Sequence, residues 1–281
     1  MNHYKYAGNS LLVDIRDRIA LVTLNRPEQM NAFSRELRNN FHRALNNLND
    51  DDNVGVIILT GAGPKAFSAG VDLKELDSAP LQAEEMGVDC QVMQAFAELQ
   101  KPTIAAINGY AVAGGLEVAI NCDILVASSN ARFADTHARV GVVPAWGVTQ
   151  NLAMLIGPMR ARYMSFTGNY VDAMTAKEWG LVLEVVSYED LVPHCLRLAK
   201  EILSCDAKTL GAMRTAMHVG LTQSIQQGLN IEAKLAKACL EDFDSRKFGT
   251  RRNAVFSRGK EQVTYASGST SHFKNDKGSV V

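Results

Sequence analysis

The chain has 281 residues, of which 47% are hydrophobic and 21% are charged. This composition is typical of a folded globular protein and excludes a disordered or fibrous one. Lysine and arginine total 29 against 30 aspartate and glutamate residues. The chain therefore lacks the overall positive charge that drives non-specific binding to nucleic acid, and we expect no nucleic-acid partner.

Five widely spaced cysteines show neither the density of a disulfide scaffold nor the pairing of a metal site. They favour a reducing cytoplasm. Residues 1–12 contain no apolar core of signal-peptide length, so export is not expected.

The first half of the chain alternates strand and helix signals. Residues 20–24 predict a strand, and Ser34 is a plausible N-cap for a helix whose apolar positions recur at helical spacing over 37–48. The polar run 49–52 ends that helix. Residues 56–60 are continuously apolar, which is typical of a strand covered on both faces.

The pattern then repeats. A polar helical stretch over 82–100 precedes a predicted strand at 103–107, an apolar helix at 116–121 and a short strand at 124–127. Further along, helical patterns dominate from about residue 147, and only residues 181–186 resemble another strand. The sequence thus predicts an α/β protein whose C-terminal part is mainly helical.

One weakly polar run, 102–120, approaches the length of a membrane span. It contains Asn108, Glu117 and four glycines, so we interpret it as buried polypeptide and expect no membrane partner.

Two glycine-rich segments, 66–73 and 109–117, each place small residues where a helix begins. Backbone N–H groups are free at such a point, and the positive end of the helix dipole faces the same way. Together the two segments could form an oxyanion hole, which stabilises an oxygen that gains negative charge. The alternative is that the glycines only permit tight turns and close packing of helix on sheet.

Other active-site motifs do not match. Residues 61–63 lack the third glycine of a dinucleotide-binding loop, and no P-loop sequence follows, which excludes hydride and phosphoryl transfer. Ser68 does not lie in the Gly-x-Ser-x-Gly elbow of a serine hydrolase.

Glu117 is the most informative acidic residue because it lies in an apolar run. A carboxylate there either faces a solvated pocket or has a raised pKa, and both situations suit a general base. The alternative is a buried structural glutamate paired with arginine or lysine.

His137 follows a short predicted strand and is a second candidate for proton transfer. A lone histidine is more often structural, and the alternation of Asp135, His137 and Arg139 is also typical of one solvated strand face. No second histidine or cysteine lies close by in the sequence, so we predict no metal site.

Three motifs in order resemble the crotonase superfamily of enoyl-CoA hydratases and isomerases, and the resemblance extends from about Leu12 to about Val263. It favours the oxyanion hole over the packing alternative. The motifs are Leu24-Asn25-Arg26-Pro27 with Met30-Asn31-Ala32; Ala66-Phe67-Ser68-Ala69-Gly70-Val71-Asp72-Leu73-Lys74-Glu75; and Asn108-Gly109-Tyr110-Ala111 through Gly114-Gly115-Leu116-Glu117 to Cys122-Asp123.

The resemblance implies an α/β fold, a spiral of strand-strand-helix (ββα) units with a C-terminal helical region that assembles trimers, commonly paired into hexamers. It divides the chain into an N-terminal segment (1–11), the crotonase-like core (12–195), a helical trimerisation region (196–263) and a tail (264–281). The tail is poor in apolar residues, and we expect it to be flexible.

For the site, the resemblance implies that the N–H groups of Val71 and Gly114 form the oxyanion hole and that Glu117 is one of two acid/base residues. The usual second glutamate is replaced by His137, and Ala145-Trp146-Gly147-Val148 replaces a glycine-rich stretch. No prosthetic group is implied, because coenzyme A is part of the thioester substrate. Its expected contacts are Ala32, Ala69, Asp72, Leu73, Lys74, Phe256 and Lys260, with Arg258 beside the last two.

The first hypothesis is therefore hydration of a trans-2-enoyl-CoA to a 3-hydroxyacyl-CoA. A second is double-bond isomerisation, which needs only one base. A third is a non-catalytic protein that binds acyl-CoA.

Overall fold

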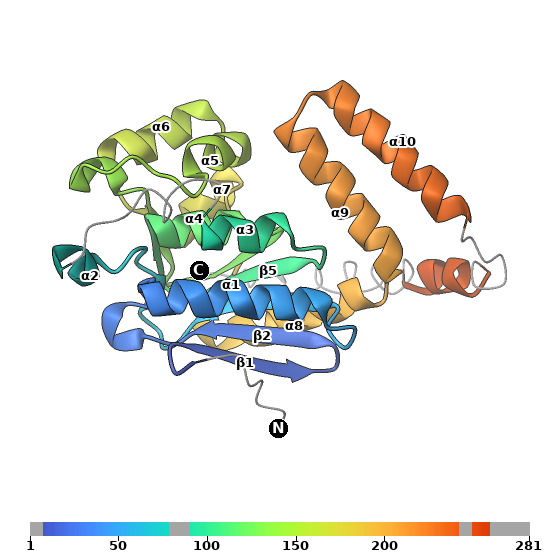
Figure 1. Cartoon of the computed structure of the whole chain (residues 1–281), viewed down its shortest axis with the longest axis horizontal. Coiled ribbons are helices and arrows are strands. Elements are labelled where there is room, and N and C mark those ends of the chain that lie inside the picture. The colour runs from blue at the N-terminus through green and yellow to red at the C-terminus, as the bar shows by residue number, and fades with distance from the viewer. Residues whose placement is uncertain (1–7, 79–89, 242–248, 259–281) are drawn as a thin grey trace, which may run out of the picture.

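The computed structural model describes residues 8–78, 90–241 and 249–258, and its centre is a six-stranded sheet (Figure 1). The strand order is β1-β2-β3-β5-β7-β10; β1 and β2 are antiparallel and the other neighbours are parallel. Every residue of β3 and β5 is buried, as the apolar runs predict. The bounds are β1 (Leu11–Arg16), β2 (Ile19–Leu24), β3 (Val56–Gly61), β5 (Thr103–Ile107), β7 (Ile124–Ser128) and β10 (Glu184–Val186).

A second sheet has the order β4-β6-β8-β9. Three of its strands follow a strand of the main sheet directly, in the pairs β3–β4, β5–β6 and β7–β8, and a helix comes after each pair. This repeat confirms the predicted spiral of ββα units. The bounds are β4 (Ala66–Ser68), β6 (Tyr110–Val112), β8 (Arg132–Ala134) and β9 (Val171–Asp172), and the short helices are η1 (Pro27–Gln29), α2 (Leu73–Ser78) and η3 (His137–Val140).

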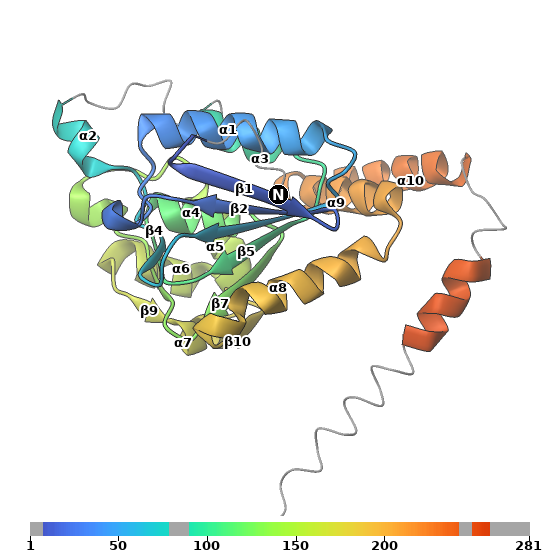
Figure 2. The same ribbon diagram turned by 90° about the horizontal axis from the view of Figure 1, so that it is seen from below.

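Helices cover both faces of the main sheet (Figure 2). On one face lie α1 (Arg35–Asp50), α3 (Gln91–Ala97) and α4 (Gly114–Ile120). The Ser34 hydroxyl accepts a hydrogen bond from the Leu37 N–H at 3.1 Å, which confirms the predicted N-cap. The predicted helix at 82–100 is confirmed only for α3, since residues 79–89 lie outside the described ranges.

The other face is covered by α8 (Tyr188–Leu203). Its residues Leu191, Cys195 and Ala199 recur every four positions, so they form one stripe. This stripe packs against side chains of β3 and β5 that include Ile58 and Ile104. Alternate residues of the central strands therefore serve two separate cores.

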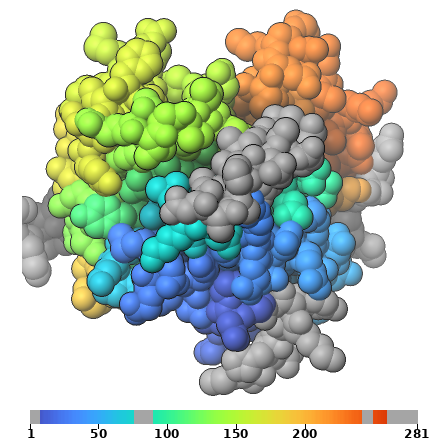
Figure 3. All heavy atoms as spheres, turned by 60° about the vertical axis from the view of Figure 1, so that its left-hand side comes forward, coloured from blue at the N-terminus to red at the C-terminus, as the bar shows by residue number. Residues whose placement is uncertain are grey.

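The rest of the described C-terminal part is mainly helical, as predicted, although β9 adds a two-residue strand that the sequence did not predict. Helices α9 and α10 form a hairpin that projects from the core (Figures 1 and 3). A Cβ added to Gly228 would lie 2.8 Å from the Gly220 Cα, so the backbones of the two helices are in direct contact at these glycines. The bounds are α5 (Val148–Ile156), α6 (Pro158–Thr167), α7 (Ala173–Trp179), α9 (Ala207–Thr222) and α10 (Ile225–Glu241), followed by a helix over 249–258.

None of the described helices combines the length and the hydropathy that crossing a bilayer requires. The run 102–120 instead forms β5, β6 and α4, all but a few of whose residues are buried. This confirms that the run is buried polypeptide.

Candidate active site

The two glycine-rich segments meet in space. A Cβ added to Gly70, whose φ is +90°, would lie 2.8 Å from the Gly114 nitrogen. One added to Gly115 would lie only 2.0 Å from the carbonyl oxygen of Ser68. The start of α4 therefore packs on the backbone at the end of β4, which only residues without a side chain allow.

Two backbone N–H groups at this contact, those of Val71 and Gly114, have no acceptor among the described residues. Phe33 and Val71 form an isolated β-bridge, but its two hydrogen bonds do not involve the N–H of Val71. The Phe33 N–H donates to the Gly70 carbonyl at 2.7 Å, and the Asp72 N–H donates to the Phe33 carbonyl at 3.1 Å. Gly114 is the first residue of α4, so its N–H has no acceptor within the helix. Among the hydrogen bonds of the described residues, neither the Val71 nor the Gly114 N–H is a donor.

The turn before Gly114 has a strained backbone. Ala113 has φ +50° and ψ −121°, a combination that a residue with a side chain rarely adopts. Its N–H donates to the Ala134 carbonyl at 3.0 Å, and its own carbonyl accepts from the Glu117 N–H at 3.0 Å. These bonds hold the start of α4 against the end of β8.

Glu117 is buried beside this turn, with 2% of its surface exposed. Its Oε1 accepts hydrogen bonds from the N–H groups of Trp146 (2.8 Å) and Val148 (3.2 Å). Burial raises the pKa of Glu117, although His137 and the two N–H groups act in the opposite direction. No arginine or lysine pairs with this carboxylate in the part of the chain that the structure describes, which argues against the structural alternative.

His137 faces Glu117, with 3.6 Å between His137 Nε2 and Glu117 Oε2. Its other ring nitrogen, Nδ1, lies 2.6 Å from Oδ1 of Asp135. Residues 137–140 form the 3₁₀ helix η3, so the interpretation of Asp135, His137 and Arg139 as one strand face is wrong. The Asp135 carboxylate instead accepts the backbone N–H of His137, the first residue of this short helix, at 3.3 Å.

The separation of 3.6 Å is too long for a direct hydrogen bond between Glu117 and His137. One water oxygen can contact both atoms across such a distance. The site therefore combines two free N–H groups with an adjacent pair of acid/base side chains.

Trp146 and Asn121 also shape the site, although neither was predicted to have a role there. A Cβ added to Gly114 would lie 2.8 Å from Cζ3 of the Trp146 ring, and the ring packs edge-on against Phe33 at 5.9 Å. The Asn121 side chain donates to the Trp146 carbonyl at 2.9 Å. The only sequence signal was an aromatic residue in a stretch where the family has glycines.

Five of the residues that the resemblance assigns to coenzyme A gather around the bridge between Phe33 and Val71. Arg26 links two of them, because it donates to the carbonyl of Ala32 at 2.6 Å and forms an ion pair with Asp72 at 2.7 Å. The five are Ala32, Ala69, Asp72, Leu73 and Lys74.

The C-terminal candidates lie elsewhere. Phe256 belongs to the helix over 249–258 and is 63% exposed. Ion pairs from Arg251 to Asp206 and from Arg258 to Glu201, both 2.6 Å, hold this helix at the junction of α8 and α9. The structure thus does not bring Phe256 to the turns of the same chain, and Lys260 lies outside the described residues.

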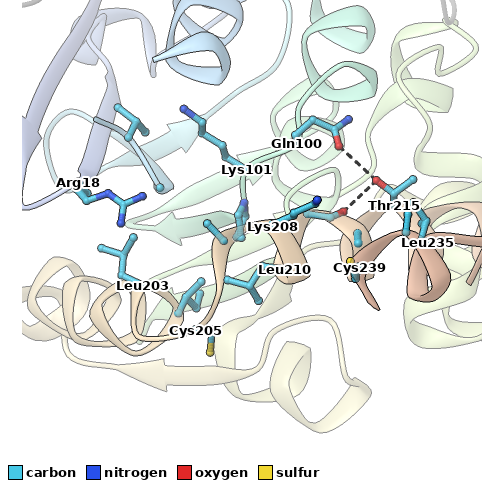
Figure 4. Close-up of a pocket in the computed structure, with 18 residues that line it drawn as sticks. Arg18, Gln100, Lys101, Leu203, Cys205, Lys208, Leu210, Thr215, Leu235 and Cys239 are labelled. Carbon is cyan, nitrogen blue, oxygen red and sulfur yellow. Dashed lines mark hydrogen bonds between the residues drawn. The ribbon is translucent and has the colours of Figure 1, made fainter. Parts of the chain in front are cut away.

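A pocket of about 430 Å³ opens between the core and the α9–α10 hairpin (Figure 4). Gly55 and Pro102, which precede β3 and β5, contribute to its wall, so it lies at the opposite end of the main sheet from the two turns. Among the described residues that line it there is no aspartate, glutamate or histidine. The candidate acid/base residues lie instead at the turns near the carboxyl ends of the strands, where open α/β sheets bind their ligands.

Comparison with known proteins identifies the family of the chain. The enoyl-CoA hydratase/isomerase family matches residues 14–258. Crotonyl-CoA hydratase of Syntrophomonas wolfei is 32% identical over 256 residues, covering 89% of this chain and 98% of the relative. Short-chain-enoyl-CoA hydratase of Clostridium acetobutylicum is 32% identical over 240 residues, covering 85% and 92%.

Solved structures show the same likeness. The crystal structure of enoyl-CoA hydratase from Bacillus anthracis superposes with a TM-score of 0.78 at 33% identity, covering 86% of this chain and 95% of that one. The enoyl-CoA hydratase from Mycobacterium smegmatis is 43% identical, with a TM-score of 0.69 and coverage of 84% and 100%. With its ββα spiral and two adjoining glycine-rich turns, the chain belongs to the enoyl-CoA hydratase/isomerase family.

Proposed function

We propose that the protein is a hydro-lyase that adds water to a trans-2-enoyl-CoA and yields a 3-hydroxyacyl-CoA. The observation that carries this proposal is the pair formed by Glu117 and His137, 3.6 Å apart, next to two free backbone N–H groups. Relatives named crotonyl-CoA hydratase and short-chain-enoyl-CoA hydratase support it.

The Val71 and Gly114 N–H groups bind the thioester oxygen of the substrate. They gain most when that oxygen becomes negative in the enolate, so they stabilise the transition state more than the bound substrate. Because α4 rests on the backbone of β4, both donors are held in place before the substrate arrives.

The water contacts both Glu117 Oε2 and His137 Nε2 from the side that faces the substrate. Glu117 removes one of its protons as the oxygen forms a bond to the β carbon, and the electrons of the double bond move to the thioester oxygen. The proton passes from Glu117 to His137 Nε2 and then to the α carbon of the enolate. Both protein groups end as they began, and one water has been added.

Coenzyme A is carried as part of the substrate, and the mechanism requires no prosthetic group. Its adenine and phosphates lie along Ala32, Ala69, Asp72, Leu73 and Lys74, a set that the fold brings together at one end of α2. Phe256 and Lys260 contact the coenzyme of a neighbouring subunit, which is consistent with the exposed position of Phe256.

The chain assembles as a trimer, or as a dimer of trimers, through residues 196–263, while 12–195 form the catalytic core. The α9–α10 hairpin supports this assembly because it exposes large apolar side chains that a monomer would leave in water. Sedimentation velocity at micromolar concentration should give the mass of three or six chains, and a monomer would contradict the assembly. The exposed apolar side chains of the α9–α10 hairpin are Met213, Met217, Leu221, Ile225, Leu229 and Leu240.

The cytoplasm is the proposed location. All five cysteines are free thiols, as a reducing compartment requires. Cell fractionation with an antibody against the protein tests this assignment.

Products separate the three hypotheses. Incubation with crotonyl-CoA should yield a species heavier by one water, as measured by mass spectrometry. Conversion of a 3-enoyl-CoA to a 2-enoyl-CoA without addition of water to crotonyl-CoA would favour the isomerase. No change in either substrate, with retained binding, would favour the non-catalytic protein.

Substitutions of His137 test its part in hydration. His137→Ala should lower kcat for crotonyl-CoA hydration by about 10²–10⁴, the usual effect of losing an acid/base group. His137→Glu should keep or raise the rate, because it restores the carboxylate common in the family. Steady-state rates and thermal midpoints measured together decide the matter.

A fully active His137→Asn variant with wild-type stability would show that the histidine only fills space. An isomerase that relies on Glu117 alone would tolerate His137→Ala better than Glu117→Gln.

A further inference from the structure

We infer that Asp135 is a positioning residue for hydration: it keeps the proton of the His137 ring on Nδ1 and directs the lone pair of Nε2 toward Glu117. The inference rests on the proposed function for its consequence in catalysis. Its statement about the ring does not depend on that function and starts from the contact between Asp135 Oδ1 and His137 Nδ1, which are 2.6 Å apart.

Asp135 is itself fixed by the fold. It follows β8 directly, and the last residue of that strand, Ala134, accepts the N–H of Ala113 at 3.0 Å. Its Oδ1 also accepts the backbone N–H of His137 at 3.3 Å. The carboxylate therefore holds both the backbone and the ring of His137, and it is anchored to the turn that precedes Gly114.

Asp135 is only 1% exposed, yet it is ionised. Burial alone would raise its pKa, but hydrogen bonds from His137 and Ser165 outweigh burial and lower the pKa of Asp135. An ionised carboxylate can only accept hydrogen bonds. The hydrogen between the two groups must therefore sit on His137 Nδ1.

A neutral imidazole with its hydrogen on Nδ1 has a lone pair on Nε2. That nitrogen is the one that faces Glu117 Oε2 at 3.6 Å, so it can accept the proton that Glu117 takes from water. When it does, the ring becomes an imidazolium whose positive charge lies against the Asp135 carboxylate. The opposite tautomer would present an N–H to Glu117 and could not accept the proton.

The alternative is that Asp135 only binds the backbone at the start of η3 and holds the loop together. Both roles predict some loss of stability when Asp135 is replaced, so stability cannot separate them. A positioning role predicts in addition that the effect on kcat disappears when residue 137 is no longer a histidine.

The experiment therefore measures Asp135→Asn in two backgrounds, the wild type and His137→Glu. In the wild type the substitution should lower kcat for crotonyl-CoA hydration by about 10²-fold, because the amide can donate to Nδ1 and favour the wrong tautomer. KM and the binding of the unreactive butyryl-CoA should stay within about twofold, since Asp135 does not face the substrate. In His137→Glu the same substitution should change kcat by less than about threefold.

A matched control is Ser165→Ala, which removes a side-chain hydrogen bond to Asp135 and leaves its contact with the ring in place. It should leave the nitrogen that carries the ring proton unchanged. If it lowers kcat as much as Asp135→Asn does, the effect comes from the loop and the inference fails.

Nitrogen NMR of histidine-labelled protein reads the tautomer directly and does not depend on turnover. The chain has six histidines, and the signals that vanish in His137→Glu identify His137. We expect an Nδ1–H ring in the wild type and a changed pattern in Asp135→Asn. An Nε2–H ring in the neutral wild type, full kcat in Asp135→Asn, or equal losses in both backgrounds would overturn the inference.

A wild type that does not hydrate crotonyl-CoA, but has the Nδ1–H ring, would instead reject the proposed function and leave the geometric assignment in place.

Discussion

Replacing Glu117 by glutamine is expected to lower kcat for crotonyl-CoA hydration by about 10²–10⁴, the loss typical of a missing general base. The amide oxygen can still accept the N–H groups of Trp146 and Val148, which now bind Oε1. The amide nitrogen takes the place of Oε2, which faces His137. This nitrogen donates a hydrogen bond at the position where the water needs an acceptor for its proton. The variant therefore keeps the shape of the site but lacks the base.

Two controls separate chemistry from folding in this variant. The Kd of Glu117→Gln for butyryl-CoA should stay within about threefold of the wild-type value, because binding of an unreactive thioester does not require the base. Stability should not fall: burial raises the pKa of Glu117, so the folded wild type binds this proton more tightly than the unfolded chain does and loses stability as the pH rises.

Glutamine stays neutral at every pH. The thermal midpoint of Glu117→Gln should therefore match the wild type below the ordinary pKa of glutamate and exceed it at neutral pH. Near-complete hydratase activity in this variant would assign the base to another group.

Substitution of Gly115 by alanine should affect activity and stability together. The new Cβ would lie 2.0 Å from the carbonyl oxygen of Ser68 and 2.6 Å from its carbonyl carbon. Neither backbone atom can rotate away, so α4 must move off β4. This separates the Gly114 N–H from the Val71 N–H, and we expect kcat to fall by about 10²–10³, as when one oxyanion donor is lost.

Crowding of this kind also costs about 1–3 kcal/mol of the free energy of unfolding. Denaturant titration measures it. The matched control is Gly211→Ala within α9, where the added Cβ meets only the Gln100 carbonyl at 3.8 Å. That variant should keep wild-type kcat. If Gly115→Ala behaves like the control, the contact between the two turns does not position the oxyanion donors.

Elements with strong local signals could be predicted from the sequence. The Ser34 cap, the apolar stripe of α1 and the buried strands β3 and β5 follow from residue type and spacing alone. Strands β4, β6 and β8 could not be predicted as strands, because three residues are too few to show an alternating pattern. Yet these strands carry the turns of the site.

The candidates for the chemistry can be identified from residue type and position in the chain: glycines that allow close approach, a glutamate in an apolar run, and a histidine where the family has an acid. How these residues act together depends on contacts that form only in the folded protein. Trp146 holds Glu117 from 29 positions away, and the 3.6 Å between Glu117 and His137 depends on the register of β6 against β8. Such contacts are set by packing between distant segments, and no local pattern of residues encodes them.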